Sequence, residues 1–407
     1  GIDLGPGAAQ AHGRSGAEEG RGEVLAANFR SARGCVTTPS HGRLRGRLRG
    51  MWPYWLMFVL PAAMAIAARR RLPSTMTGLH SVKLDGPWIF FITFFTLVIG
   101  YRVEVGGDWG SYLGYLERVR YYRFSEIFEL GDPGYQIINW LSNRLNWGIW
   151  GVNLFCGLVF SIGLAVFSRS LPRPWLSLTV AVPYLLTVVA MGYSRQAVAL
   201  GFAMLGLVSL GHKRVFWFAF WVVVGATFHK SAVLLLPIAA LASTRNKYWT
   251  AFWVGLVAVL AYVLLLQDDA ENLYVNYVVA EYQSQGALIR TAMNAVPAAL
   301  LLVWQRRFRL AEGEAALWRW FALISLAFVF VLVATPATTA VDRMALYLLP
   351  LQLFVFARLP EAWGRGRDEC ALWVLAVVAY YALVHFVWLN FAGHASAWLP
   401  YRNWLFE

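Results

Sequence analysis

The sequence predicts an all-α fold, a polytopic integral membrane bundle of about 10–12 transmembrane or re-entrant helices. Hydrophobic residues make up 59% of the 407 residues and charged residues 14%, which is about half the charged share of a typical soluble domain. A water-soluble fold could not bury this much apolar surface. Apolar runs of helical length also recur along most of the chain. The three cysteines have no spacing typical of a disulfide framework or a metal site.

The first segment, residues 1–50, differs from the rest of the chain. It is rich in Gly, Ala, Arg and Ser and has almost no large apolar residue, so it cannot form a core. Position 1 is Gly, whereas Met51 leads directly into an apolar run. We interpret Met51 as the natural start, residues 1–50 as a disordered basic tail, and 51–407 as the membrane domain. The alternative is a basic arm that binds anionic lipid or nucleic acid.

The membrane domain contains twelve apolar runs, several of them shorter than the roughly 20 residues that cross a bilayer. We expect helices at each run, some of them re-entrant. The runs cover residues 52–68, 87–101, 149–167, 175–191, 195–211, 215–228, 231–242, 251–266, 287–304, 316–334, 343–357 and 370–389.

Basic residues in the connections predict the orientation of these helices. Connections rich in Lys and Arg alternate with connections richer in acids, Tyr and Trp, and we expect the basic ones to face the cytoplasm. The long loop 102–148 then faces the periplasm, together with 192–194, 229–230, 267–286, 335–342 and the C-terminal tail. The basic connections contain Arg69–Arg71, Arg169 with Arg173, Lys213 with Arg214, Arg245 with Lys247, Arg306 with Arg307 and Arg309, and Arg358 with Arg365 and Arg367.

Residues 215–242 have basic flanks on both sides, but each half is too short to cross the roughly 30 Å hydrocarbon core. We expect a re-entrant hairpin whose tip holds His229 and Lys230 below the outer surface. Ionisable groups at that depth line a wet cavity or pair with acids. The alternative is one long kinked helix in which His229 has no function.

Two acidic motifs lie in the long outer loop. Asp108, Tyr112 and Tyr115 have the i, i+4, i+7 spacing of one helix face, although Asp108 could serve only as an N-cap. Asp132 precedes Pro133 and an amphipathic stretch, an arrangement typical of a capped helix start. Tyr135 follows at the beginning of that helix.

Three basic motifs lie on the same predicted side of the membrane. Arg195 opens an apolar run, where it either snorkels to lipid headgroups or turns toward an anionic ligand. Lys230 follows His229 at the re-entrant tip. Arg343 and Tyr347 share a helix face, and the simpler interpretation of Arg343 is a local contact with Asp342.

Together these motifs indicate a site for a membrane-linked diphosphate. Arginine forms bidentate contacts with phosphate, so Arg195, Lys230 and Arg343 are the candidate diphosphate ligands. Asp108 or His229 could act as general base. The rings of Tyr112, Tyr115, Tyr135 and Tyr347 could stack on sugars. No nucleotide-binding or metal motif is found, so we expect no cofactor, no metal and no nucleic-acid partner.

In these motifs the chain resembles the EpsG family of exopolysaccharide polymerases, relatives of the Wzy O-antigen polymerases. The matching segments are Gly106–Tyr112, Asp132–Tyr135, Ser194–Gln196, Phe228–Ser231 and Arg343–Tyr347. Their order and spacing agree with the family pattern over most of residues 87–350. The departures are Trp109 in place of Tyr, Asp132 in place of Glu and Ser194 in place of Ile.

The resemblance implies a metal- and nucleotide-independent glycosyltransferase in the bacterial inner membrane. It would join polyprenyl-diphosphate-linked oligosaccharide repeat units into an extracellular or capsular polysaccharide at the periplasmic face. Arg195 would act in catalysis as well as in diphosphate binding, and a flippase and a chain-length regulator are the implied partners besides membrane lipid. The alternatives are a glycan ligase, a membrane O-acyltransferase, a transporter of lipid-linked oligosaccharide and a structural scaffold.

Overall fold

The computed structural model describes residues 50–68, 85–242, 247–265, 286–336 and 338–406. The chain divides into two units, Gly1–Arg47 and Leu48–Glu407. The first unit lies outside the described residues, as do the basic connection Arg69–Arg71, Arg245 and most of the outer loop 267–286. The interpretation of residues 1–50 therefore stays a prediction, and all the described helices belong to the second unit.

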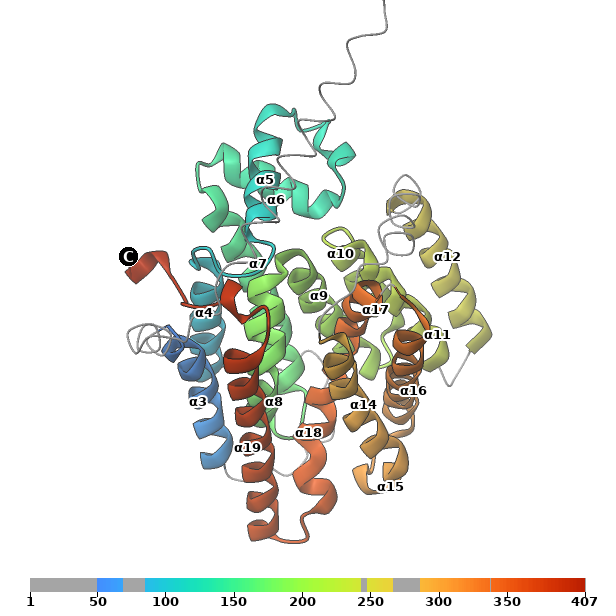
Figure 1. Ribbon diagram of the computed structural model, residues 1–407. Coiled ribbons are helices and arrows are strands. Elements are labelled where there is room, and N and C mark those ends of the chain that lie inside the picture. Colours follow the sequence, from blue (N-terminus) through green and yellow to red (C-terminus); the bar gives the residue numbers. More distant parts are fainter. Residues whose placement is uncertain (1–49, 69–84, 243–246, 266–285, 337, 407) are drawn as a thin grey trace, which may run out of the picture. The chain divides into compact units, whose positions relative to one another are not determined.

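Throughout the described part of the second unit the regular elements are helices, as Figure 1 shows, which confirms the predicted fold class. Each predicted apolar run corresponds to one helix or to two or three consecutive helices. The apolar helices are α3 (Trp52–Ala67), α4 (Gly86–Gly100), α7 (Gly148–Arg169), α8 (Pro174–Ala181), α9 (Ser194–Gly211), α10 (Val215–Ala226), α11 (Leu236–Ala242), α12 (Lys247–Leu265), α14 (Ala287–Val303), α16 (Glu312–Ala334), α18 (Pro350–Trp363) and α19 (Arg367–Phe391).

By length and composition, four of the described helices can cross a membrane, or five if one bent pair forms a single span. The four helices contain Gly148–Arg169, Ser194–Gly211, Glu314–Ala334 and Arg367–Phe391, and the bent pair joins Thr338–Leu348 to Pro350–Trp363 at 44°. Six further apolar helices have 10–17 residues. The apolar segments therefore define a membrane protein in which several helices are shorter than a full span.

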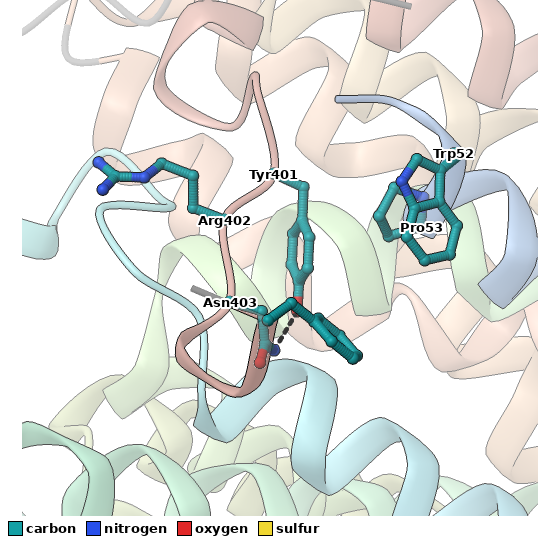
Figure 2. Close-up of a pocket in the computed structure, with 6 residues that line it drawn as sticks. Trp52, Pro53, Tyr401, Arg402 and Asn403 are labelled. Carbon is teal, nitrogen blue, oxygen red and sulfur yellow. Dashed lines mark hydrogen bonds between the residues drawn. The ribbon is translucent and has the colours of Figure 1, made fainter. Parts of the chain in front are cut away.

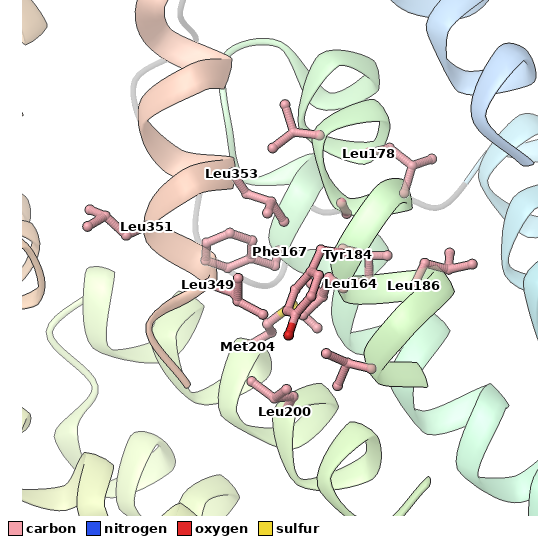
Figure 3. Packing of buried hydrophobic residues seen from close by; sticks show 14 of the residues in the cluster. Leu164, Phe167, Leu178, Tyr184, Leu186, Leu200, Met204, Leu349, Leu351 and Leu353 are labelled. Atoms are coloured by element: carbon pink, nitrogen blue, oxygen red, sulfur yellow. The ribbon is translucent and has the colours of Figure 1, made fainter. Parts of the chain in front are cut away.

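The packed core of the second unit joins α7, α8, α9 and α18, as Figure 3 shows for Leu164, Leu178, Met204 and Leu353. Helices α7 and α9 approach closely where Gly163 faces Gly201, since a Cβ on Gly163 would fall on the Gly201 carbonyl. Small residues that allow such backbone contact are typical of helix pairs in membranes, where van der Waals packing replaces the hydrophobic effect.

Between α8 and α9 the chain winds as a π-helix over Val182–Ala190. Runs of this kind are rare and mostly short, and they occur often at functional sites. This one is fully buried and ends four residues before Ser194, the first residue of α9. It therefore leads directly into the helix that begins with the predicted Arg195 motif.

The segment 215–242 breaks where the re-entrant hairpin was predicted. Helix α10 ends at Ala226, residues Lys230–Leu235 form the 3₁₀ helix η5, and α11 follows. Both η5 and α11 contact α10, so the chain folds back on itself at His229. This arrangement contradicts the alternative of one long kinked helix.

The predicted outer loop 102–148 is largely helical. It contains α5 (Trp109–Arg118), the short 3₁₀ helices η2 (Val119–Tyr121) and η3 (Ile127–Leu130), and the predicted amphipathic helix as α6 (Pro133–Arg144). Asp108 and Asp132 occupy the N-cap positions of α5 and α6, yet neither carboxylate makes a capping hydrogen bond. The two aspartates therefore occupy the predicted N-cap positions, but their side chains do not cap the helices. Both carboxylates are available for other partners.

Candidate functional site

Four motifs that are far apart in sequence come together in the second unit. The first lies before α5, the second before α6, the third in the first turn of α9 and the fourth in α17 (Thr338–Ala345). Two ion pairs join them, Asp132 with Arg195 and Asp108 with Arg343. The Gln196 amide also donates to the Arg343 carbonyl, which connects α9 to α17. We call Asp108, Asp132, Arg195 and Arg343 the charged cluster.

Arg195 lies at the centre of the charged cluster. Its Nη1 is 2.9 Å from Asp132 Oδ2, and the two side chains are 27% and 6% exposed. Its guanidinium also lies over the rings of Tyr115 and Tyr135, at 4.8 and 5.9 Å from their centroids. A carboxylate and two aromatic faces therefore orient the guanidinium toward one position. Arg195 does not snorkel as an isolated cation.

Arg343 pairs more loosely with Asp108. Arg343 Nη2 and Asp108 Oδ2 are 3.9 Å apart, and about a third of each side chain is exposed. The Arg343 guanidinium also lies 5.7 Å from the Tyr193 ring centroid. This pair is the accessible part of the charged cluster, because Asp132 and its bond to Arg195 are more deeply buried.

Burial raises the pKa of both carboxyl groups. For Asp108 the burial effect exceeds the opposing effects of Arg343 and Arg195. For Asp132 burial also dominates, although Arg195, the Lys230 charge and the Lys230 backbone all favour the ionised form. A carboxylate whose pKa is raised toward neutrality is a better proton acceptor than an ordinary surface aspartate.

The re-entrant tip contributes to the same site. His229 is half-buried and lies within electrostatic reach of Arg195 and Arg343. Lys230 acts on Asp132 through its charge and its backbone, and Ser231 Oγ lies 3.3 Å from the Tyr347 hydroxyl. The structure thus brings His229 and Lys230 to the charged cluster.

The four tyrosines predicted to bind sugar are not equivalent. Tyr112, Tyr135 and Tyr347 are at most 2% exposed, whereas Tyr115 is half-buried. A sugar ring can stack only on an accessible aromatic face, so in this conformation Tyr115 alone of the four has one. The other three pack within the protein: Tyr112 and Tyr135 support Arg195 from the side of α5 and α6, and Tyr347 belongs to the main core.

Arg102 is a residue that the sequence analysis missed. Its side chain is fully buried, and it donates to the carbonyls of Ile99 and Val105, to Asn153 Oδ1 at 3.2 Å and to Ser194 Oγ at 2.7 Å. Among the ion pairs of the described residues, none includes Arg102. Its hydrogen bond to Ser194 fixes the start of α9, one residue before Arg195. The available signal was a charged residue directly after an apolar run.

Arg290 of α14 is a second missed residue. It holds Asp342 through two bonds, Nε to Oδ1 at 2.7 Å and Nη2 to Oδ2 at 2.6 Å. Asp342 pairs with Arg290 and Arg343 with Asp108, so each of the two neighbours has an ion-pair partner far away in the sequence. Tyr193 lies within electrostatic reach of both pairs, which connects Arg290 to the charged cluster.

Two further features bear on what the site can bind. Across the described residues, no group of three or more His, Cys, Asp or Glu side chains is placed to hold a metal ion. A pocket of about 180 Å³ opens beside the C-terminal residues, between Trp52, Pro53 and Tyr401–Asn403, with Phe406 as a further wall (Figure 2). This pocket contains no predicted site residue, so the charged cluster and the pocket are separate features.

Comparison with known proteins agrees with this arrangement at the level of family. No curated protein and no solved structure matches the chain. A family model does match, and it covers residues 87–403, most of the chain and every member of the charged cluster. The order of motifs, the helical fold and this match lead to one conclusion: the chain belongs to the EpsG family.

Proposed function

We propose that this protein joins polyprenyl-diphosphate-linked oligosaccharide repeat units into an extracellular or capsular polysaccharide, at the periplasmic face of the bacterial inner membrane. Membership of the EpsG family points to an exopolysaccharide-related polymerase and the apolar helices to a membrane protein. The observation that carries the finer proposal is the charged cluster, in which two arginines from different helices meet two carboxylates beside a histidine and a lysine.

The donor in this reaction is the growing chain on its lipid diphosphate. Arg195, Arg343 and Lys230 bind the diphosphate and stabilise the negative charge that develops on it as it leaves. In the free protein, Asp132 and two tyrosine rings already hold the Arg195 guanidinium in one orientation. In this proposal Arg195 is both a diphosphate ligand and a catalytic residue.

The acceptor is the terminal sugar of a second lipid-linked repeat unit. Its hydroxyl oxygen forms a bond to the anomeric carbon of the donor, and the bond from that carbon to the diphosphate oxygen breaks. Polyprenyl diphosphate leaves with the electron pair, and the hydroxyl proton passes to Asp108 or His229. Asp108 is the more accessible carboxylate of the cluster, and Tyr115 offers a ring face beside Arg195 for a sugar.

A membrane environment supplies both substrates to one place. The lipid tails keep donor and acceptor in the bilayer, while Asp108, Asp132 and Arg195 lie at helix starts and Arg343 lies in the last turn of α17. We include in the proposal that a flippase delivers the repeat units and that a chain-length regulator acts on the product.

The test compares polymer size in cells that lack the protein, complemented with wild type or with Arg195→Ala at matched membrane abundance. Single repeat units should accumulate both in the null strain and with the Arg195 variant. Arg144→Ala is the matched control, because Arg144 is an exposed arginine of α6 that lies over Trp140. Full-length polymer in the null strain would remove the polymerase proposal. Full-length polymer with Arg195→Ala alone would remove the role of Arg195.

A further inference from the structure

The C-terminal residues after α19 are bound to the loop that precedes Asp108. The Gly106 amide donates to the Ala397 carbonyl at 2.8 Å, the Val103 amide to Arg402 at 3.0 Å, and the Trp404 amide to Tyr101 at 2.9 Å. Backbone bonds at three places thus join residues 101–106 to residues 397–404, which lie almost 300 positions later. Residues 101–106, just before Asp108, therefore run beside the C-terminal segment.

Trp398 is the central side chain of this contact. It is 2% exposed, and its Nε1 donates to the Thr187 carbonyl at 2.9 Å. Gly192 lies directly against the indole, because a Cβ at Gly192 would fall on the six-membered ring of Trp398. A Cβ at Gly107 would make an ordinary contact with the same ring at 3.9 Å. One indole therefore lies directly against Gly192, just before α9, and near Gly107, the residue before Asp108.

The segment itself is fixed to the helical bundle. The Tyr54 hydroxyl donates to the Trp398 carbonyl at 2.7 Å, and the Tyr401 hydroxyl donates to the Val98 carbonyl at 2.8 Å. Figure 2 shows the bond from the Asn403 amide to that tyrosine oxygen, which is 2.7 Å long. Since α3 and α4 hold the segment at both ends, it can act as a rigid support.

We propose that residues 395–404 form a support that sets the position of Asp108 relative to Arg195, and that Trp398 is its principal positioning residue. The inference rests on the proposed function for its activity readout. Asp108 and Arg195 belong to different helices, and a displacement of about 1 Å between catalytic groups can cost roughly a hundredfold in rate. Trp398 contacts Thr187, Gly192 and Trp388 and lies outside the charged cluster, so its role is positioning and not catalysis.

The geometry of Gly106 explains why such a support is needed. Gly106 has φ of +107°, and a Cβ there would fall on the Met191 carbonyl oxygen. The loop therefore lies tightly against Met191 and Gly192 in a conformation that side-chain-bearing residues avoid. The sequence Gly106-Gly107, which by itself suggests a flexible start to α5, is instead a point of close backbone approach.

The first experiment measures polymer synthesis and loop mobility in the same set of variants. Trp398→Ala should lower polymer synthesis at least about tenfold at matched abundance, and Trp398→Phe should retain more activity because it keeps part of the ring. Phe406→Ala is the matched control, since Phe406 is an aromatic residue that lies two positions beyond the support and is 79% exposed. Activity of Trp398→Ala equal to that of Phe406→Ala would overturn the proposal.

Loop mobility provides a readout that does not depend on the reaction. A spin label on Ser111→Cys, an exposed position in the first turn of α5, should report increased mobility in purified Trp398→Ala and no change in Phe406→Ala. Cys156 and Cys370 are buried, and Cys35 is replaced by Ser. An unchanged spectrum in Trp398→Ala overturns the support proposal even where the polymerase proposal stands. If the null strain makes full-length polymer and purified Trp398→Ala shows the expected increase in mobility, only the polymerase proposal is removed and the support proposal stands.

A compensating pair covers the case in which Trp398→Ala does not fold. Gly192→Ala alone forces the added methyl group against the indole and should lower activity roughly a hundredfold. Gly192→Ala with Trp398→Phe removes the ring atoms that the methyl group meets, so activity should exceed that of Gly192→Ala by about tenfold. A double variant no more active than Gly192→Ala would show that the indole contact does not set the position of the loop.

Discussion

Replacing Arg102 by Lys changes the hydrogen bonding of a buried cation while its charge is retained. Three nitrogens of Arg102 serve four acceptors that lie on different sides of the guanidinium. Lysine has a single nitrogen on a flexible stem, so at least two of these bonds are lost. At about 1.5 kcal/mol for each hydrogen bond to a charged group, the variant should lose about 3 kcal/mol of stability. That corresponds to roughly a hundredfold change in the folded-to-unfolded ratio.

The assay is unfolding of purified protein in mixed micelles, with the denaturant titration repeated for a control variant. Arg402→Lys is the control, because Arg402 and Glu104 form an ion pair at 2.6 Å with both side chains largely exposed. Exposed pairs contribute little, so the control should unfold close to wild type. An Arg102→Lys curve that coincides with the Arg402→Lys curve would refute the reasoning. Because Arg102 also holds Ser194, polymer synthesis should fall in the same variant.

Four further outcomes are expected. Burial raises the pKa of Asp108, so a general base at this position loses its charge at a higher pH than an ordinary aspartate as the pH falls. The rate of polymer synthesis in membranes should therefore decline as the pH falls through a pKa above 3.8. If the residual activity of Asp108→Asn shows the same decline, the titrating group is not Asp108. Gly106→Ala should abolish polymer synthesis. Gly107→Ala should not, because Gly107 has no positive φ and an added Cβ there makes only an ordinary contact. Equal activities of the two variants would contradict the close approach of Gly106 to Met191. A membrane-impermeant maleimide should label Ser111→Cys but not Arg367→Cys in intact cells. Both positions are exposed on the protein, but Ser111 is predicted on the periplasmic side of the membrane and Arg367 on the cytoplasmic side. The reverse labelling pattern would mean that the predicted orientation is inverted. Arg290→Lys should lose one of the two bonds to Asp342 and about 1.5 kcal/mol in the same unfolding assay, and a variant as stable as wild type would show that the second bond contributes nothing.

The helices could be predicted from the sequence because hydrophobicity is a local property. The apolar runs coincide with the helices to within a few residues, and the short halves of 215–242 predicted the break at His229. The motif around Arg195 was found for a similar reason, since a cation at the start of an apolar run either reaches the lipid headgroups or turns toward an anionic partner. Local pattern therefore indicated both the fold class and the main members of the charged cluster.

The choice of partner could not be predicted in the same way. From the sequence, the Asp132 carboxylate could cap the adjacent helix N-terminus or pair with a distant arginine. In the structure it pairs with Arg195, 63 positions away. Asp342 likewise pairs with Arg290, 52 positions earlier, which its sequence neighbour Arg343 did not suggest. These contacts depend on how the helices pack, which no local spacing encodes.

Burial of the tyrosines shows the same limit. The spacing of Tyr112 and Tyr115 correctly indicates one helix face, but spacing does not say what that face meets. The structure places Tyr112 against Tyr135, with ring centroids 5.9 Å apart, and leaves part of Tyr115 accessible. The contact of Trp398 with Gly192 joins residues more than 200 positions apart and had no signal in the sequence.

The pairing of each arginine with a carboxylate has a consequence for turnover. In the free protein Asp132 and Asp108 already occupy positions beside Arg195 and Arg343, so a diphosphate that binds there exchanges with an internal anion and does not fill an empty cationic pocket. Breaking the two internal ion pairs costs free energy, and this cost lowers the binding free energy of donor and product alike. Under the proposed function, the carboxylates would return to their arginines after sugar transfer and help to expel the polyprenyl diphosphate, which would favour release of a product that a bare cluster of cations would retain.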